Sequence, residues 1–461
     1  IDQRLSGGQP SLDSWPATGA SWAALNRLTY GPRPEELRRA GEIGLAGWIE
    51  EQLAPASLAD AALDRRLRGL DSLGLEPNEL EAWEPVDVIG ELRQATLLRR
   101  VYSRRQLYEL MVEFWTDHFN IFIDKGDCWM LQPAFDREVI RRHALGNFRE
   151  LLQASARGPA MLVYLDNQAN LAAAPNENYA RELLELHSLG VDGGYEQRDV
   201  MELARCLTGW TVKRHFWLGE WTFDAAVHAP GDKIVLGRRI AAGDQSEAEQ
   251  VIDMLAAHES TARFIAGKLA RWLLADEPPP ALVGRAAAAF GRSGGDIAAT
   301  LRVILLDGLA GAPELAPKIK RPQQFVAAAL RQLNADSDGG PALQSFLAAM
   351  GQPLFGHPTP DGYADRAAAW QGNLLPRWQF ALALARNEIA GTTIDLSDLS
   401  QAGGGATAAE QLDRFAGWLL GAPLPPGPRR GLLASLQGGD EADQTALALA
   451  ALLASPQFQW R

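Results

Sequence analysis

The sequence predicts a mainly α-helical protein, a large array of stacked helical hairpins with one small β-hairpin region inserted at about residues 210–240. Two observations support this fold class. Apolar residues recur at the three- and four-residue spacing of an amphipathic helix along most of the 461 residues. Between about residues 210 and 240, aromatic and β-branched residues surround a Gly-bearing turn instead, a pattern typical of a hairpin.

The expected elements follow one another along the chain. Residues 1–20 are rich in Gly, Ser, Pro and Asp and predict an extended arm that wraps onto the body. Helical spacing begins at Trp22, and Pro34 followed by two glutamates favours a helix start. Further helices are expected at residues 46–53, 58–70, 88–119, 133–155, 176–189, 197–209, 246–274, 280–309, 320–334, 342–350, 376–387, 407–420 and 442–455.

These elements divide the chain into the N-terminal arm at residues 1–20, an N-terminal helical half at 21–209, the β-hairpin insert at 210–240 and a C-terminal helical half at 241–461. In the insert, residues 211–217 and 220–223 flank Leu218 and Gly219, and residues 233–236 follow Pro230 and Gly231. Loops are expected at residues 276–280, 353–365 and 403–405. We expect the two helical halves to pack as one unit.

The bulk composition limits the classes of function. No apolar run approaches the roughly 20 residues that span a bilayer, so no transmembrane segment is expected. A net charge of -13 argues against a nucleic-acid partner, because phosphate binding draws on an excess of Lys and Arg. Cys128 and Cys206 stand in no zinc or Cys-x-x-Cys spacing and permit at most one disulfide. A start at Ile1 without Met indicates a processed N-terminus.

The most polar segment with a regular pattern is residues 175–190. At about 100° per residue, Asn178, Arg181, Glu182 and Glu185 share one face of a helix, while His187 lies on the apolar side. Paired carboxylates on one face could bind a cation or a sugar, or divide general acid and base work. A solvated, ion-paired helix face is the alternative interpretation. His187 is expected in the core with one ring nitrogen bonded to a carbonyl.

Two further sites are expected before this segment. Asp117 and His118 end a helical stretch among bulky aromatic residues, so His118 is a candidate general base, metal ligand or substrate contact. A core histidine with satisfied hydrogen bonds is the alternative. Asp166 and Asn167 follow a predicted helix and lead into the polar segment, where capping of the helix end is the alternative.

His228 and Lys233 converge on a Gly-bearing turn at the predicted hairpin. Turn formation explains the Pro, Gly and Asp between them but not these two side chains. The sequence contains no His-Glu-x-x-His, no Gly-x-Ser-x-Gly, no phosphate-binding Gly-x-x-x-x-Gly-Lys-[Ser/Thr] and no Cys-x-x-Cys-His. Motifs alone therefore assign no reaction.

Several of these segments together resemble the large bacterial family called domain of unknown function 1800. The matching pieces are residues 28–32, 114–119, 143–146 with 164–167, 176–190 with 199–210, 228–237 and 454–458, which run in order through nearly the whole chain. The resemblance implies an extracytoplasmic protein, periplasmic or secreted, whose gene neighbours often encode a sulfatase- or phosphatase-like protein. Asp117 stands where the family generally has Asn, and Ala229 where it generally has Asp. If relatives bind a ligand there, the chain is expected to differ in metal affinity or activity.

Residues and resemblance together predict an exported protein with one polar pocket. The leading hypothesis is a hydrolase or lyase that acts on an extracellular or cell-surface carbohydrate, with Arg181 and Lys233 orienting an anionic group. The alternatives are a non-catalytic binding or assembly protein that works with the sulfatase- or phosphatase-like partner, and a metal- or cofactor-binding protein of unspecified ligand. The expected catalytic residues are His118, Glu182 and Glu185, and the expected substrate-binding residues are Asp117, Asp166, Asn167, Asn178, Arg181, His228 and Lys233.

Overall fold

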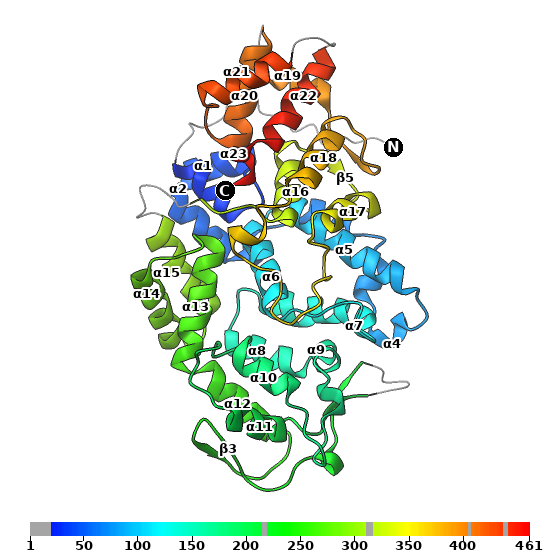
Figure 1. Ribbon diagram of the computed structural model, residues 1–461, viewed down its shortest axis with the longest axis vertical. Helices are drawn as coiled ribbons and strands as arrows, with labels where there is room; N and C mark the ends of the chain where they lie inside the picture. Colours follow the sequence, from blue (N-terminus) through cyan, green and yellow to red (C-terminus); the bar gives the residue numbers. More distant parts are fainter. Residues whose placement is uncertain (1–19, 214–218, 310–316, 404–406, 437–440) are drawn as a thin grey trace.

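Helices dominate an elongated molecule, with the C-terminal helices at one end of the long axis and the β3 region at the other (Figure 1). The computed structural model describes residues 20–213, 219–309, 317–403, 407–436 and 441–461. Its described strands form three two-stranded antiparallel sheets. The predicted mainly α fold with a small inserted β region is therefore confirmed. The predicted arm at residues 1–19 lies outside the described residues.

The described helices have the following bounds. The N-terminal part contains α1 (Ala20–Leu28), α2 (Pro34–Leu53), α3 (Ala61–Arg66), α4 (Pro77–Leu80), α5 (Pro85–Tyr102), α6 (Gln106–His118), α7 (Cys128–Ala134), α8 (Phe148–Arg157), α9 (Pro159–Tyr164), α10 (Asn178–Glu185) and α11 (Gln197–Cys206). The remainder contains α12 (Ser246–Ala256), α13 (Glu259–Leu273), α14 (Pro280–Arg292), α15 (Ile297–Leu309), α16 (Pro322–Gln332), α17 (Pro341–Ala349), α18 (Leu374–Ala385), α19 (Leu396–Gly403), α20 (Ala408–Leu420), α21 (Pro426–Ser435), α22 (Glu441–Ala454) and α23 (Pro456–Gln459). Among the described helices, none combines the length and apolar character needed to cross a membrane.

Three long helical patterns in the sequence are each two helices in the structure, because a polar or glycine turn interrupts them. Ser103 ends α5 in extended conformation, and its hydroxyl donates to Asp60 at 2.6 Å. His258 separates α12 from α13, where its Nδ1 accepts the backbone N–H of Ser260 at 3.1 Å and caps α13. Gly294 and Gly295 form the turn between α14 and α15. Continuous apolar spacing therefore overestimates helix length here.

The β region consists of two hairpins. Strand β1 (Trp210–Val212) pairs with β2 (Trp221–Phe223), and β3 (Lys233–Val235) pairs with β4 (Arg238–Ile240). Residues 214–218 of the predicted first hairpin lie outside the described residues. A third pair, β5 (Asp336–Ser337) with β6 (Thr392–Thr393), joins distant segments and has no signal in the local sequence pattern.

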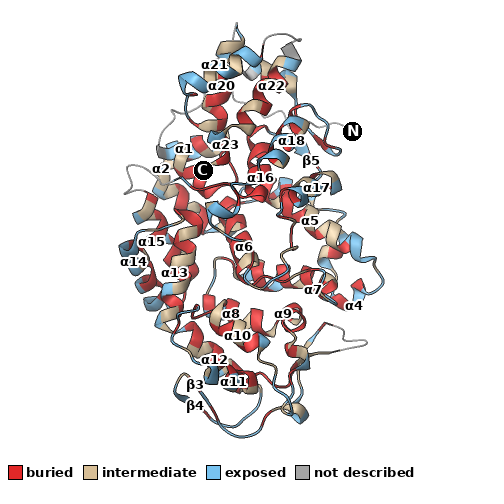
Figure 2. Ribbon diagram, in the orientation of Figure 1, coloured by how far each residue is buried: buried red, intermediate tan, exposed pale blue. Residues whose placement is uncertain are grey.

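Buried residues occur along most of the described helices (Figure 2). Their apolar side chains form two hydrophobic clusters. The first extends from α1 to α15, and the second contains the helices from α16 onward together with Tyr30 and part of α5. Helix α6 contributes to both clusters, since Met111 and Trp115 belong to the first and Leu110 to the second. The polar end of α6 therefore lies where the two clusters meet.

Both cysteines, Cys128 and Cys206, are free and buried. Burial raises the pKa of each thiol to about 12. Because the thiolate is the reactive form, iodoacetamide is expected to leave both cysteines of the native protein unmodified and to modify both in denaturant. Mass spectrometry of the alkylated protein checks this result. Equal rates of alkylation in the native and unfolded states would contradict the burial.

Candidate functional site

A cavity of about 270 Å³ lies between α6, α13 and the loop that joins α17 to α18. In Figure 1 this loop descends past α16 toward α6 and α7. The lining includes Asp117 and His118 from α6, Lys268 and Arg271 from α13, and Asp361 and Asp365 from the loop. Asp117 and His118 are thus the predicted site residues that line this cavity. The loop predicted at residues 353–365 supplies one wall.

His118 is buried at the end of α6, where its two ring nitrogens have different partners. Its Nε2 lies 3.1 Å from the backbone oxygen of His187, and its Nδ1 lies 2.9 Å from Nζ of Lys268. A carbonyl oxygen only accepts, so Nε2 carries the ring proton. Burial, followed by Lys268 and His187, holds the pKa of His118 well below its usual range. The ring is therefore neutral, and its Nδ1 accepts a hydrogen bond from Lys268.

Lys268 is the functional candidate that the sequence interpretation missed. Burial lowers its pKa from 10.5 to about 8, although Asp117 and Asp365 oppose that change. Within the described chain Lys268 forms no ion pair with a carboxylate. Phe264, Lys268 and Arg271 are spaced four and three residues apart on α13 and so share one helix face, which is the sequence signal that could have pointed to Lys268. A lysine with this pKa can exchange a proton near neutral pH.

An ion-pair network holds the polar end of α6 in place. Arg321 donates to Asp117 at 2.6 Å and also to Glu113, which accepts the hydroxyl of Tyr30 at 2.6 Å. The guanidinium of Arg321 stacks over Trp272 at 4.4 Å from the ring centre. Burial raises the pKa of Asp117 although Arg321 opposes the rise. The Asp117 carboxylate thus has a buried cationic partner in Arg321.

The loop wall is fixed closely against α6. Asn120 donates from its side chain to the backbone oxygens of His357 at 3.0 Å and Thr359 at 2.8 Å. Gly362 has a φ of +70° and lies so close to the carbonyl of Asp117 that a Cβ atom would collide with it. Its backbone conformation and this close approach both require glycine. The loop therefore presents Asp361 and Asp365 to the cavity in a defined position.

The end of the segment at residues 175–190 contacts His118 and Phe264. The backbone oxygen of His187 accepts the ring N–H of His118, and Gly190, with a φ of +83°, packs against the ring of Phe264. His187 is buried as predicted, and burial lowers its pKa to about 3. The predicted bond from its ring to a carbonyl is not formed, because neither ring nitrogen has a partner among the described residues. The backbone oxygen of His187, and not its ring, is therefore the group that contacts His118.

The side chains of Asp166, Asn167 and Asn178, at and before the start of α10, bond to other groups of the protein. Asn167 is buried and donates to the backbone oxygen of Trp210 at 3.0 Å, while Asn178 donates to that of Leu165 at 3.2 Å. Asp166 forms an ion pair with Lys125 at 2.9 Å. These contacts agree with the alternative interpretation of a capped and tied helix end. None of the three residues lines the cavity beside His118.

Glu182 and Glu185 are half-buried on α10, and neither lines the cavity beside His118. Burial raises the pKa of Glu182, and the carboxylates of Glu185 and Asp361 add to the rise. Glu185 accepts the hydroxyl of Tyr195 at 3.1 Å. Arg181 turns away from this pair and forms its ion pair with Glu177 at 3.0 Å.

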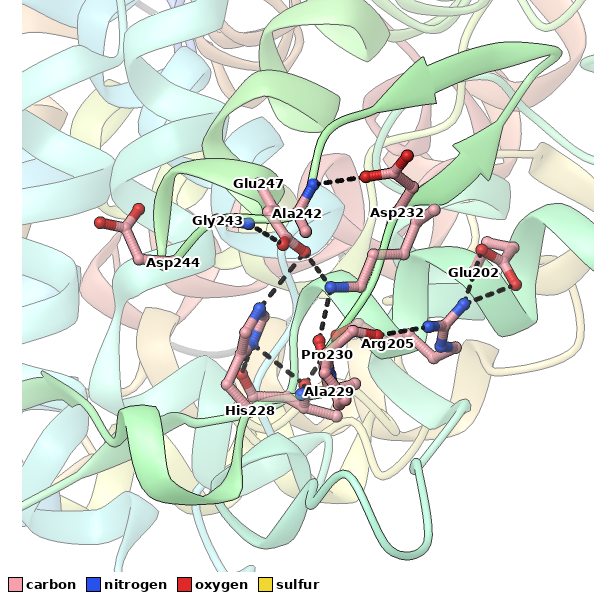
Figure 3. A network of polar contacts seen from close by, with 12 residues as sticks. Glu202, Arg205, His228, Ala229, Pro230, Asp232, Ala242, Gly243, Asp244 and Glu247 are labelled. Atoms are coloured by element: carbon pink, nitrogen blue, oxygen red, sulfur yellow. Dashed lines mark hydrogen bonds and ion pairs between the residues drawn. The ribbon is translucent and has the colours of Figure 1, made fainter.

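His228 lies in a separate, internal network around Glu247 (Figure 3), to which Lys233 of β3 also belongs. Both approach one carboxylate oxygen of Glu247, with distances of 3.3 Å from Nε2 of His228 and 2.5 Å from Nζ of Lys233. Lys233 also donates to the backbone oxygen of Ala229 at 2.5 Å, and Glu247 accepts the N–H of Gly243 at 2.7 Å. Lys233 and Glu247 are fully buried. This network ties the hairpin to α12 and does not share the cavity.

The predicted site residues thus occupy several places and are not gathered in one pocket. Local spacing cannot show this, because Lys268 and Arg321 are 150 and 204 positions from His118 and Asp117, and Glu247 lies on a different element from Lys233. Across the described ranges, no group of three or more His, Cys, Asp or Glu side chains is arranged to hold a metal ion. The cavity is instead a place where one lysine, three arginines and three aspartates meet beside aromatic rings.

Comparison with known proteins gives one match. A family model described as "Protein of unknown function (DUF1800)" matches residues 23–460, nearly the whole chain. No curated protein and no solved structure matches the chain significantly.

Proposed function

The chain belongs to the DUF1800 family, and we propose that it is an exported enzyme, a hydrolase or lyase that cleaves an extracellular or cell-surface carbohydrate beside His118. The observation that carries this proposal is the pairing of Lys268 with a neutral His118 at the edge of a cavity. A perturbed pKa in a concave site with convergent polar groups is typical of a catalytic centre. Tyr363 adds aromatic surface to the lining, which suits a sugar ring.

In this proposal Lys268 is the general base. The hydrogen bond to Nδ1 of His118 uses one N–H of the amine and leaves the lone pair of its neutral form for a substrate proton. His118 is a positioning residue, because its ring is already bonded at both nitrogens. Arg271 lies three residues further along α13 and lines the same cavity, so it replaces Arg181 and Lys233 as the group that orients an anion.

Glu182 is the second ionisable group of the proposed site. Its pKa is raised by burial and by the carboxylates of Glu185 and Asp361, and a protonated carboxyl is the form that a general acid needs. Asp361, one of the carboxylates that raise this pKa, lines the cavity, which couples Glu182 electrostatically to the site. This keeps the acid–base function that the sequence suggested for α10, with Lys268 as the base.

Turnover on polysaccharides tests the proposal. The purified protein is incubated with a panel of neutral and acidic polysaccharides, and new chain ends are counted. Cleavage of at least one polymer by the wild type, lost in Lys268→Gln, is the expected result. Absence of cleavage across the panel, or equal cleavage by Lys268→Gln, would reject the proposed enzyme.

A binding or assembly protein, working with the sulfatase- or phosphatase-like partner, is the second candidate. The observation that favours it is the internal bonding of Asn167, Asn178 and His228, which shows that much of the polar sequence pattern holds helices together. In that case Glu182 would also be structural, and its replacement would mainly lower the melting temperature.

We expect Glu182→Gln to leave stability at neutral pH unchanged or slightly higher. The folded-state pKa of Glu182 is raised, so the native state binds its proton more readily than the unfolded state, and ionisation above that pKa costs stability. Gln removes this cost, which is below about 1 kcal/mol for a half-buried group. Urea unfolding at neutral and acidic pH measures the effect. A large drop in stability at neutral pH would favour the structural role.

A further inference from the structure

We propose that the cleavage is a β-elimination beside a carboxylate, so that the substrate is an acidic polysaccharide built from uronate sugars. This inference rests on the proposed function and concerns the same cavity. The inference depends on the pairing of the charged side chains that line the cavity. Some of them form ion pairs or hydrogen bonds within the protein, and others do not. Hydrolysis and elimination need different sets of free groups, so the two reactions can be separated on that basis.

The carboxylates of the lining are poorly suited to hydrolysis. Glycosidases generally place two carboxyl groups on either side of the scissile bond, one as acid and one as base or nucleophile. Asp117 is held by Arg321 at 2.6 Å, and Asp365 by Lys318 at 2.9 Å. Asp361 accepts the hydroxyl of Thr359 at 2.6 Å, and despite partial burial its pKa is lowered by Thr359 and His357. It is therefore ionised and cannot serve as an acid at neutral pH.

The cations of the lining suit elimination. Lys268 and Arg271 stand one helical turn apart on α13, and neither forms an ion pair with a carboxylate in the part of the chain that the structure describes. Arg271 uses its Nε for the backbone oxygen of Asp276 at 3.2 Å. Its guanidinium can therefore receive a substrate carboxylate while the Lys268 amine faces the adjacent carbon. Pairing with a guanidinium stabilises the negative charge that develops when that carbon loses its proton.

The reaction balances without another reagent. The neutral amine of Lys268 removes the proton from the ring carbon that bears the carboxylate. The electron pair of that carbon–hydrogen bond forms a carbon–carbon double bond, and the bond from the next ring carbon to the glycosidic oxygen breaks. The leaving oxygen takes the proton back from the Lys268 ammonium on the same face of the sugar, so the elimination does not use Glu182 as its acid. The products are an unsaturated uronate end and a new sugar hydroxyl, and Lys268 is restored to the amine.

The test uses polygalacturonate, alginate and hyaluronan, each beside its carboxyl-reduced neutral counterpart. We expect at least one uronate polymer to give unsaturated ends, seen by the ultraviolet absorption of the conjugated double bond, in equal number to the bonds cut. Its reduced counterpart should not be cut, because it lacks the carboxylate that acidifies the carbon–hydrogen bond.

Variants on one helix supply the matched comparison. Arg271→Gln should raise KM for the uronate polymer and lower kcat/KM by about 100-fold or more, as expected when a charged contact to the substrate is lost. Arg263→Gln, an exposed change on the same helix, should leave the rate unchanged. Equal rates for Arg271→Gln and Arg263→Gln would overturn the assignment of Arg271.

The outcomes separate this inference from the proposed function. New reducing ends without unsaturated ends would mean hydrolysis, which overturns the elimination and keeps the enzyme. Cleavage of neutral polysaccharides alone would do the same. Failure to cut any polymer, uronate or neutral, would reject both.

Discussion

Replacing Glu247 by Gln is expected to lower the free energy of unfolding by about 3 to 5 kcal/mol, because the change leaves a buried charge without its partner. Lys233 is completely buried, and Glu247 is its only carboxylate partner among the described residues. His228 approaches the same carboxylate oxygen. Gln has nearly the same size as Glu, so the decrease in the free energy of unfolding reports the removal of the negative charge. Urea unfolding of the purified variant gives the value.

An exposed ion pair on the same helix provides the control. Asp253, also on α12, pairs with Arg149 at 2.5 Å, and both side chains are at least a third exposed. Asp253→Asn should therefore cost no more than about 1 kcal/mol. If the two variants lose similar stability, the network in Figure 3 is not the buried ionic junction described above.

Lys268→Gln is expected to reduce kcat by about 100- to 10,000-fold on the polymer that the wild type cleaves, which is the usual contribution of a general base. The fold should persist, because Lys268 stands at a cavity and balances no carboxylate as an ion pair. Circular dichroism and unfolding curves verify this. A variant that keeps full activity would remove Lys268 from the mechanism.

The pH dependence of the wild-type rate also tests whether Lys268 is the general base. The pKa of Lys268 is lowered to about 8, and only the neutral amine can accept a proton. The rate should therefore rise with pH until it levels off above about 8. Lys268→Arg is the matched variant, because its guanidinium stays protonated throughout this range and should not restore activity. A rate that falls across this range would contradict a lysine base.

Much of the fold could be predicted because helical periodicity is a local signal. The helices around Pro34, Asn178 and Ser246 begin close to the expected positions. One small hairpin region was expected at about residues 210–240 from its aromatic and β-branched residues, and the structure has two hairpins there. Helix breaks were missed where a side-chain cap such as His258 interrupts continuous apolar spacing. The β5–β6 pair was missed because its strands are two residues long and far apart in sequence.

The candidate site could be predicted only in part. His118 was identified from its place among aromatic residues, where a polar ring needs partners. Those partners, Lys268 and the backbone of His187, are separated from it by 150 and 69 positions. Lys233 was identified as an unexplained side chain of the hairpin turn, but its partner Glu247 lies on a later helix. A local pattern marks polar residues that need an explanation and does not say which of them meet.

The measurement that tests the account most directly is the pKa of Lys268 itself, which needs no substrate. Trace labelling of amines across a pH series, followed by mass spectrometry of the peptide that carries Lys268, gives that value in the folded protein. The result expected is half-maximal reactivity of Lys268 near pH 8. A Lys268 that titrates near the usual value of about 10.4 would contradict the proposed base and the site built around it.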